Sequence, residues 1–291
     1  MAEIATPTVT KLTSTGASWD GAAADLMEQL YNYFNATSVL WGIDLASTPT
    51  GTPTGSDSFT LLAAGAETFQ INLRRTTAAI IQFIVDPDGT ITNSSTKAGL
   101  SANACTEKAT ITISSSGAYA LILEWADAIM ILIDNAASTA HPMGAHAGKI
   151  FTPMYADDAS RGVDGLGILG GTPTTANSVA NWTSNTGATY SFIRVNDTGV
   201  PATDWSNDFT FLDDAPNSDP SLGGAYYFSP HLFRTKDSNG RIIGICKYLI
   251  RADQDRASRT RLENGLAVGK YLHIGGATDC LLVPWPDATP P

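Results

Sequence analysis

Apolar residues in this chain fall mostly into short runs that have the length of β-strands. Dense runs occupy residues 78–85, 118–125 and 127–134, and residues 109–115 alternate between apolar and polar side chains. Turn-forming residues separate most of these runs. Helices do not alternate regularly with them, which argues against a doubly wound or α/β-barrel fold. The pattern predicts a mainly β protein whose antiparallel strands form a sandwich or barrel-like sheets, connected by long Gly/Thr-rich loops.

One segment near the start has the pattern of an amphipathic helix. Between residues 20 and 34, apolar side chains recur three or four positions apart and form one stripe. Asp20 can accept hydrogen bonds from the free N–H groups of a first helical turn. We therefore expect one N-terminal helix, at about residues 20–34, whose stripe packs into the core. The stripe consists of Ala23, Leu26, Met27, Leu30, Tyr31 and Phe34.

Composition divides the chain near residue 135. Residues 1–19 are polar and Thr-rich and predict an extended N-terminal arm, whereas residues 20–135 hold the helix and the dense apolar runs. Residues 136–291 are richer in Gly, Thr, Asn and Pro and predict a loop-rich β domain. That half includes a long β-hairpin over residues 226–252, because a DSNG turn joins two apolar runs. This composition is compatible with two domains divided near residue 135 and with a single domain.

The glycines at 165, 167 and 170 have the spacing G-x-G-x-x-G. In dinucleotide-binding proteins this motif lies between a strand and a helix. Here the preceding residues are polar, and Pro173 and several threonines oppose a helix on the other side. We therefore expect no nucleotide cofactor.

We interpret the same glycines as conformational, in a long loop over residues 145–175. Glycine admits positive φ and close approach of the backbone to other surfaces. Long loops of this kind are usually functional or interaction elements. The candidate contact residues in it are Gly165, Leu166, Gly167 and Ile168.

Residue types that carry catalysis or bind metals do not form a recognisable motif. His141 and His146 are close in sequence to Asp157 and Asp158, but Pro142 and Gly144 disfavour a helix that would present both histidines to zinc, so loop histidines are expected. The three cysteines are far apart and lack C-x-x-C spacing.

Carboxylate pairs and nucleophile motifs give no stronger signal. Asp213 and Asp214 are adjacent, and adjacent residues of a strand point to opposite faces rather than across a cleft. Calcium binding by the Asp-rich stretch 213–220 lacks the EF-hand spacing. No G-x-S-x-G, H-E-x-x-H or P-loop motif occurs. We therefore predict a protein that is not an enzyme and holds no metal.

Charge argues against nucleic acid as a partner and identifies one basic segment. The net charge is −11, so the chain as a whole repels phosphate backbones. Residues 241–270 nevertheless carry seven Lys/Arg residues against three acids. They form either a solvated face or a basic patch that meets an acidic surface of a neighbouring subunit. The candidate contacts in it are Arg251, Arg256, Arg259 and Arg261.

Two tryptophans lie in polar contexts, Trp182 in NWTS and Trp205 in TDWSND. Aromatic side chains beside Asn and Asp can stack on sugar rings, so a glycan is one possible ligand. The other reading is that they anchor loops to the body or to another subunit, since aromatic residues also dominate protein interfaces.

Hydropathy gives no membrane-spanning segment and no secretory signal peptide. The first 21 residues lack a basic region followed by an apolar one. No apolar run approaches the length of a membrane span. We expect synthesis in the cytoplasm and no membrane partner.

The chain resembles virion structural proteins of tailed bacteriophages. The resemblance lies in an acidic, cysteine-poor, Ala/Gly/Thr-rich chain of β segments, and in the stretches AHAGKIFTPMYADDASRGVDGLGILGG (145–171) and YLHIGGATDCLLVPWPD (271–287). It implies a non-enzymatic structural subunit of the virion, as a capsid-decorating, neck, tail or baseplate component. Its partners would be itself, as a homo-oligomer, and other virion proteins. The alternative is a carbohydrate-binding or host-recognition module of a phage tail or fibre.

Overall fold

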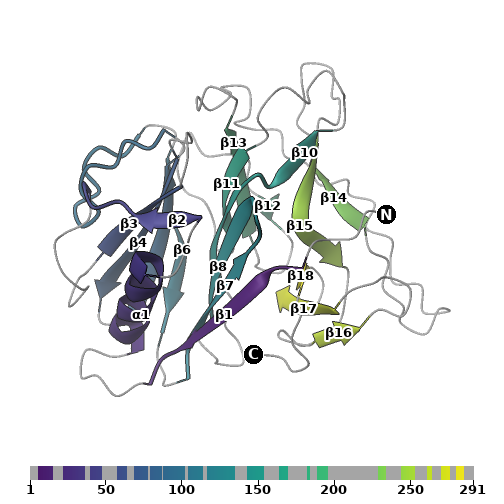
Figure 1. Ribbon diagram of the computed structural model, residues 1–291, viewed down its shortest axis with the longest axis horizontal. Coiled ribbons are helices and arrows are strands. Elements are labelled where there is room, and N and C mark those ends of the chain that lie inside the picture. Colours follow the sequence, from purple (N-terminus) through teal and green to yellow (C-terminus); the bar gives the residue numbers. More distant parts are fainter. Residues whose placement is uncertain are drawn as a thin grey trace.

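The computed structural model describes the larger part of the N-terminal half and isolated strands of the C-terminal half (Figure 1). The described ranges are 6–15, 22–36, 40–47, 58–63, 69–77, 79–86, 88–101, 104–113, 117–134, 143–153, 164–169, 182–183, 189–195, 229–233, 244–252, 261–263, 270–275 and 280–284.

These ranges form three sheets, and every strand pair in them is antiparallel. The central sheet runs in the order β1 (Thr8–Thr13), β7 (Tyr119–Glu124), β8 (Ala128–Asp134), β9 (Met143–Gly148), β11 (Asp164–Leu169), β13 (Thr189–Val195), β12 (Trp182–Thr183). The helix-side sheet runs β2 (Trp41–Ile43), β3 (Ser58–Ala63), β4 (Gln70–Thr77), β5 (Ile80–Asp86), β6 (Cys105–Thr112).

The third sheet, called the C-terminal sheet, is built almost entirely from late segments. It runs β10 (Phe151–Pro153), β15 (Gly244–Ala252), β18 (Cys280–Pro284), β17 (Lys270–Gly275), β16 (Arg261–Glu263), and β14 (Ser229–Phe233) pairs with β15. The predicted antiparallel β class is therefore confirmed. Within the hairpin expected over residues 226–252, β14 and β15 pair as antiparallel strands, and the predicted DSNG turn lies outside the described residues.

The sheets are arranged in layers around the central sheet. In Figure 1 the helix-side sheet and α1 (Ala22–Ala36) lie to one side of the central sheet, and the C-terminal sheet lies to the other. Packing of these layers against both faces of the central sheet (Figure 1) explains why β7 and β8 are buried at almost every position rather than at alternate ones.

The single helix predicted from the sequence is α1, and its apolar stripe lies in the core. All six stripe residues are buried, and they pack with side chains of the helix-side and central sheets in one hydrophobic cluster. Burial of each large stripe side chain contributes about 1.5–3 kcal/mol. The helix begins two residues later than expected, and the proposed capping residue, Asp20, lies outside the described ranges.

The prediction of a glycine-rich loop over residues 145–175 is wrong for much of that stretch. Residues 164–169 form β11, which pairs with β9 on one side and β13 on the other. Gly165, Leu166 and Gly167 are buried there. The small residues of β9 and β11 still complete the ladder, because strand pairing depends on backbone hydrogen bonds rather than on side-chain size.

Strands of the central sheet come from both sides of residue 135, where composition changes. β7 and β8 precede it, and β9, the strand paired with β8, follows it. A domain boundary at that residue would divide a hydrogen-bonded sheet. Residues 8–13 of the expected N-terminal arm form β1 in the same sheet.

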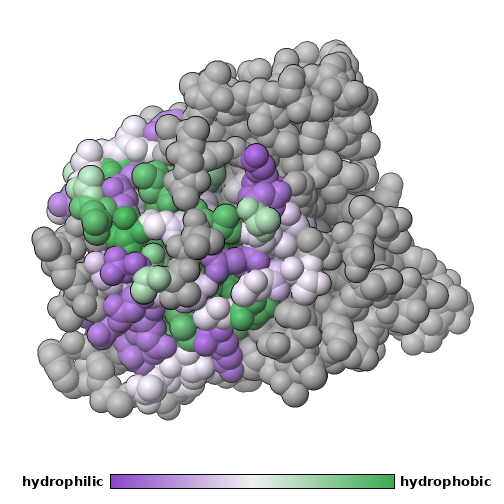
Figure 2. Space-filling model, viewed as in Figure 1, coloured by the Kyte–Doolittle hydropathy of each residue, from purple (hydrophilic) through white to green (hydrophobic). Residues whose placement is uncertain are grey.

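The near face of the described part mixes hydrophobic and hydrophilic side chains (Figure 2). The large hydrophobic side chains that are exposed there or elsewhere in the described ranges are Leu45 and Leu62. None of the helical residues described makes a segment long and apolar enough to cross a membrane.

Candidate functional site

The central and C-terminal sheets meet where the chain passes from β9 into β10. The tight turn between β7 and β8 binds this connection, because the Lys149 N–H donates to the Asp127 carbonyl at 2.7 Å. Within the turn, the Trp125 N–H donates to the Ala128 carbonyl at 2.8 Å. Four side chains gather at this place, and we call them the aromatic joint. They are Trp125, Asp127, His146 and Tyr248.

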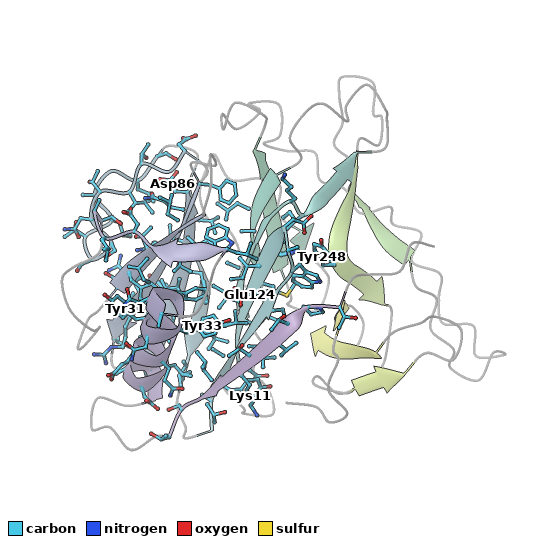
Figure 3. The ribbon with its side chains drawn as sticks, viewed as in Figure 1. Lys11, Tyr31, Tyr33, Asp86, Glu124 and Tyr248 are labelled. Atoms are coloured by element: carbon cyan, nitrogen blue, oxygen red, sulfur yellow. The ribbon has the colours of Figure 1, made fainter. Side chains whose placement is uncertain are left out.

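Tyr248 reaches the joint through an irregular place in β15. The strand pairs with β10 over Gly244–Cys246 and with β18 over Ile250–Ala252, and Tyr248 lies between the two ladders with a φ of 68°. A bulky residue seldom adopts positive φ, and such strain persists only where surrounding contacts hold it. Irregularities of this kind redirect a side chain, and here the redirected ring lies against the central sheet (Figure 3).

The contacts of Tyr248 are a ring stack and a hydrogen bond to the same turn. The centroid of its ring lies 4.3 Å from that of the Trp125 ring, with an interplanar angle of 18°. Its hydroxyl donates to Asp127 Oδ1. A stacked aromatic pair contributes about 0.5–1.5 kcal/mol beyond the area that it buries. Burial and the hydrogen bond to Asp127 raise the pKa of Tyr248 above its usual value. The tyrosine therefore stays protonated and acts as a fixed donor that joins the two sheets.

His146 is the buried member of the joint. It lies on β9 with no exposed surface, and its ring centroid is 6.0 Å from that of Trp125 and 6.4 Å from that of Tyr248. Burial lowers the pKa of His146 to about 3, although the Asp127 carboxylate acts in the opposite direction. The imidazole is therefore neutral at pH 7.

We expect the joint to make the protein less stable in acid. The unfolded chain takes up a proton at His146 near pH 6.5, whereas the folded protein does so only near pH 3. Stability from the neutral imidazole is therefore complete above pH 6.5 and decreases as the pH falls, with a limiting slope of about 1.4 kcal/mol per pH unit. Urea unfolding of the native chain and His146→Gln between pH 7 and pH 4 measures this slope. Equal slopes in the two proteins would contradict the account.

A second polar cluster holds the segment 88–101 against the helix-side sheet. Asp86, at the end of β5, is fully buried and accepts hydrogen bonds from the backbone N–H groups of Asp88, Thr90 and Ser101 and from the hydroxyl groups of Thr90 and Ser101. The shortest, from Ser101 Oγ to Asp86 Oδ1, is 2.6 Å. These bonds satisfy a carboxylate that would otherwise be costly to bury.

Amide side chains from β4 bind the same segment further along. Gln70 Oε1 accepts the Ile91 N–H at 2.8 Å, and its amide nitrogen donates to Asp44 Oδ2 at 2.8 Å. Asn72 donates to the Ser94 carbonyl at 3.3 Å. The polar residues of this sheet therefore give a long connection one fixed shape.

α1 is tied to the end of β1 and to β7. The Asp25 carboxylate accepts the Thr15 N–H at 2.7 Å, and Gln29 Nε2 donates to the Thr13 carbonyl at 3.1 Å. Tyr33 donates its hydroxyl to Glu124 of β7 (Figure 3). Burial, followed by the hydrogen bond to Glu124, raises the pKa of Tyr33 to about 12.

The residues proposed from the sequence as contacts do not form one group. Gly165, Leu166, Gly167 and Ile168 lie within the central sheet on β11, and Leu166 is fully buried, so it is not at the surface of this chain. Trp182 lies on β12, the last of the described strands of that sheet. Arg251 lies on β15 and Arg261 on β16. Trp205, Arg256 and Arg259 fall outside the described residues, as do His141, Asp157, Asp158 and the acidic stretch 213–220.

The aromatic joint was not predicted from the sequence. Its members come from one turn and two strands that are about a hundred residues apart, and only the register of the sheets brings them together. The W-A-D stretch at 125–127, between two apolar runs, was the available signal for the turn. No group of three or more His, Cys, Asp or Glu residues in the described ranges is placed to hold a metal ion.

No protein-family model matches this chain, and no curated protein matches its sequence significantly.

Proposed function

We propose that this chain is a non-enzymatic structural subunit of a tailed-phage particle, a capsid-decorating, neck, tail or baseplate component that acts through contacts with copies of itself and with other virion proteins. The observation that carries the proposal is the end of the central sheet at β1. This edge strand has exposed or half-buried side chains throughout, and no described strand lies on its outer side. Such edges present unpaired peptide groups to a partner chain.

The internal contacts support the same conclusion. The Asp86 cluster and the aromatic joint use carboxylate, amide and phenol groups to fix a long connection and to lock two sheets together. A subunit that assembles through repeated weak contacts needs a rigid body of this kind, since every contact depends on the same relative geometry. The sequence resemblance to tailed-phage virion proteins is the reason for proposing that the particle is a tailed phage.

Self-association of the purified chain tests the proposal. We expect light scattering over a range of concentrations to give a discrete oligomer with cyclic or dihedral symmetry, because homo-oligomers usually close. A monomer at every concentration that also fails to bind other virion proteins would contradict it.

The alternative is a carbohydrate-binding or host-recognition module of a phage tail or fibre. Trp182 favours it, because this tryptophan lies on β12, which among the described strands ends the central sheet on the side opposite to β1. A glycan array distinguishes the two functions. Specific hits that are lost in Trp182→Ala would favour the alternative, and an array without specific hits would favour the structural role.

A further inference from the structure

We propose that β1 is the surface through which two copies of this chain associate, by antiparallel pairing of β1 with β1 of the second copy. The inference rests on the proposed function, since it names the contact by which a structural subunit would assemble. Pairing across a two-fold axis would extend the central sheet continuously from one copy into the other.

The hydrogen bond of Ser14 fixes which peptide groups of β1 point outward. β1 and β7 pair in a register that places Thr13 opposite Tyr119, and the next residue, Ser14, donates its N–H to the Ala118 carbonyl at 2.8 Å. Opposite residues of antiparallel strands alternate between hydrogen-bonded and non-hydrogen-bonded pairs. Residues 8, 10 and 12 therefore direct their peptide groups toward β7, and residues 9, 11 and 13 direct theirs outward.

Two contacts with α1 agree with this assignment and close one end of the edge. Gln29 donates to the carbonyl of Thr13, and Asp25 accepts the N–H of Thr15, so both contacts use groups that face away from β7. In the described part of the chain, the outward N–H and carbonyl groups of Val9 and Lys11 are left for another strand, together with the Thr13 N–H.

The side chains of β1 suit strand pairing. The sequence TVTKLT has high β propensity, no Pro or Gly and a single charge. A lysine on an edge normally discourages pairing. Here the Lys11 ammonium lies 4.8 Å from the ring centroid of Tyr119 on the neighbouring strand, so it is drawn back onto its own sheet.

One register satisfies the outward groups of Val9 and Lys11 in both copies. When Thr10 faces Thr10, Val9 of each copy exchanges both hydrogen bonds with Lys11 of the other. This register places Pro7 opposite Thr13. The Thr13 carbonyl is already used by Gln29, and Pro7 has no N–H to offer it, while the Thr13 N–H faces the Pro7 carbonyl. Centring on Lys11 would oppose two ammonium groups. Centring on Val9 would place Pro7 opposite Lys11 and leave the Lys11 carbonyl without a donor.

The test is Lys11→Pro, which removes an outward N–H and leaves the bonds between β1 and β7 intact. We expect it to weaken dimerisation by about 100-fold or more, because the two-fold axis doubles the loss. Lys11→Ala keeps the N–H and controls for the lost side chain. This control should change the dissociation constant by less than about tenfold. Sedimentation equilibrium gives the constants, and thermal unfolding checks that each variant folds.

Hydrogen exchange of the native chain gives a second readout that needs no variant. The Val9 and Lys11 amides should become protected as the concentration rises, while the Thr10 amide stays protected throughout. If Lys11→Pro and Lys11→Ala associate equally well in an assembling protein, or if exchange at Val9 and Lys11 does not depend on concentration, the pairing of β1 is wrong and the structural function stands. If the native chain never associates with itself or with virion proteins, both fail.

Discussion

Gly144→Ala is expected to prevent stable folding of the central sheet. Gly144 lies on β9 between β8 and β11, and a Cβ atom built there would be 1.7 Å from the Ile131 carbonyl oxygen. That neighbour is backbone in a fully buried strand, so it cannot turn aside as a flexible side chain could. The free energy of unfolding should fall by at least about 3 kcal/mol, at the upper end of the cost of overpacking. Urea unfolding, or loss of soluble protein, measures the effect.

Gly42→Ala is the matched control for this substitution. Gly42 is also in a strand, β2, but apart from its own chain neighbours no atom lies within 4 Å of the position its Cβ would take. The substitution should be neutral or stabilise by less than about 1 kcal/mol, because alanine loses less backbone entropy on folding than glycine. Similar unfolding midpoints for the two variants would contradict the claim that the β8 backbone leaves no room for a side chain at residue 144.

Asp86→Ala is expected to have the second largest effect. The substitution removes the acceptor of five hydrogen bonds, from Asp88, Thr90 and Ser101. Leaving buried donors without a partner costs about 1–3 kcal/mol for each group that water cannot reach. The total loss should be about 3 kcal/mol, with faster proteolytic cleavage of segment 88–101. Urea unfolding and limited proteolysis measure the two effects.

Thr92→Val, in the same segment, separates this effect from a general sensitivity of the loop. The exposed Thr92 hydroxyl donates only to the Ala98 carbonyl, at 3.1 Å, and should be worth less than about 1 kcal/mol. An equal loss in both variants would mean that the buried carboxylate is not what anchors the segment.

Patterns of apolar residues along the sequence predicted the helix and the strands whose own side chains fill the core. The stripe from Ala23 to Phe34 identified α1, and the dense runs identified β5, β7 and β8 within a few residues. In these segments, side-chain periodicity and length directly reflect which faces are buried.

Strands made of small residues could not be predicted in the same way. β9 and β11 contain glycines and alanines that usually indicate loops, and they become strands because β8 and β13 offer complementary backbone edges. The aromatic joint depends on the same long-range pairing, since the distance from Trp125 to Tyr248 in the sequence carries no signal of contact. The positive φ of Tyr248 could not be predicted for the same reason, because contacts with residues distant in the sequence hold it.

The most direct test of the structural function is electron microscopy of the purified native chain over a series of concentrations. The structural function predicts discrete symmetric particles. The pairing of β1 further predicts that they contain two-fold axes at which neighbouring subunits join edge to edge. Isolated single subunits at every concentration, in a preparation that also fails to associate with virion proteins, would contradict it.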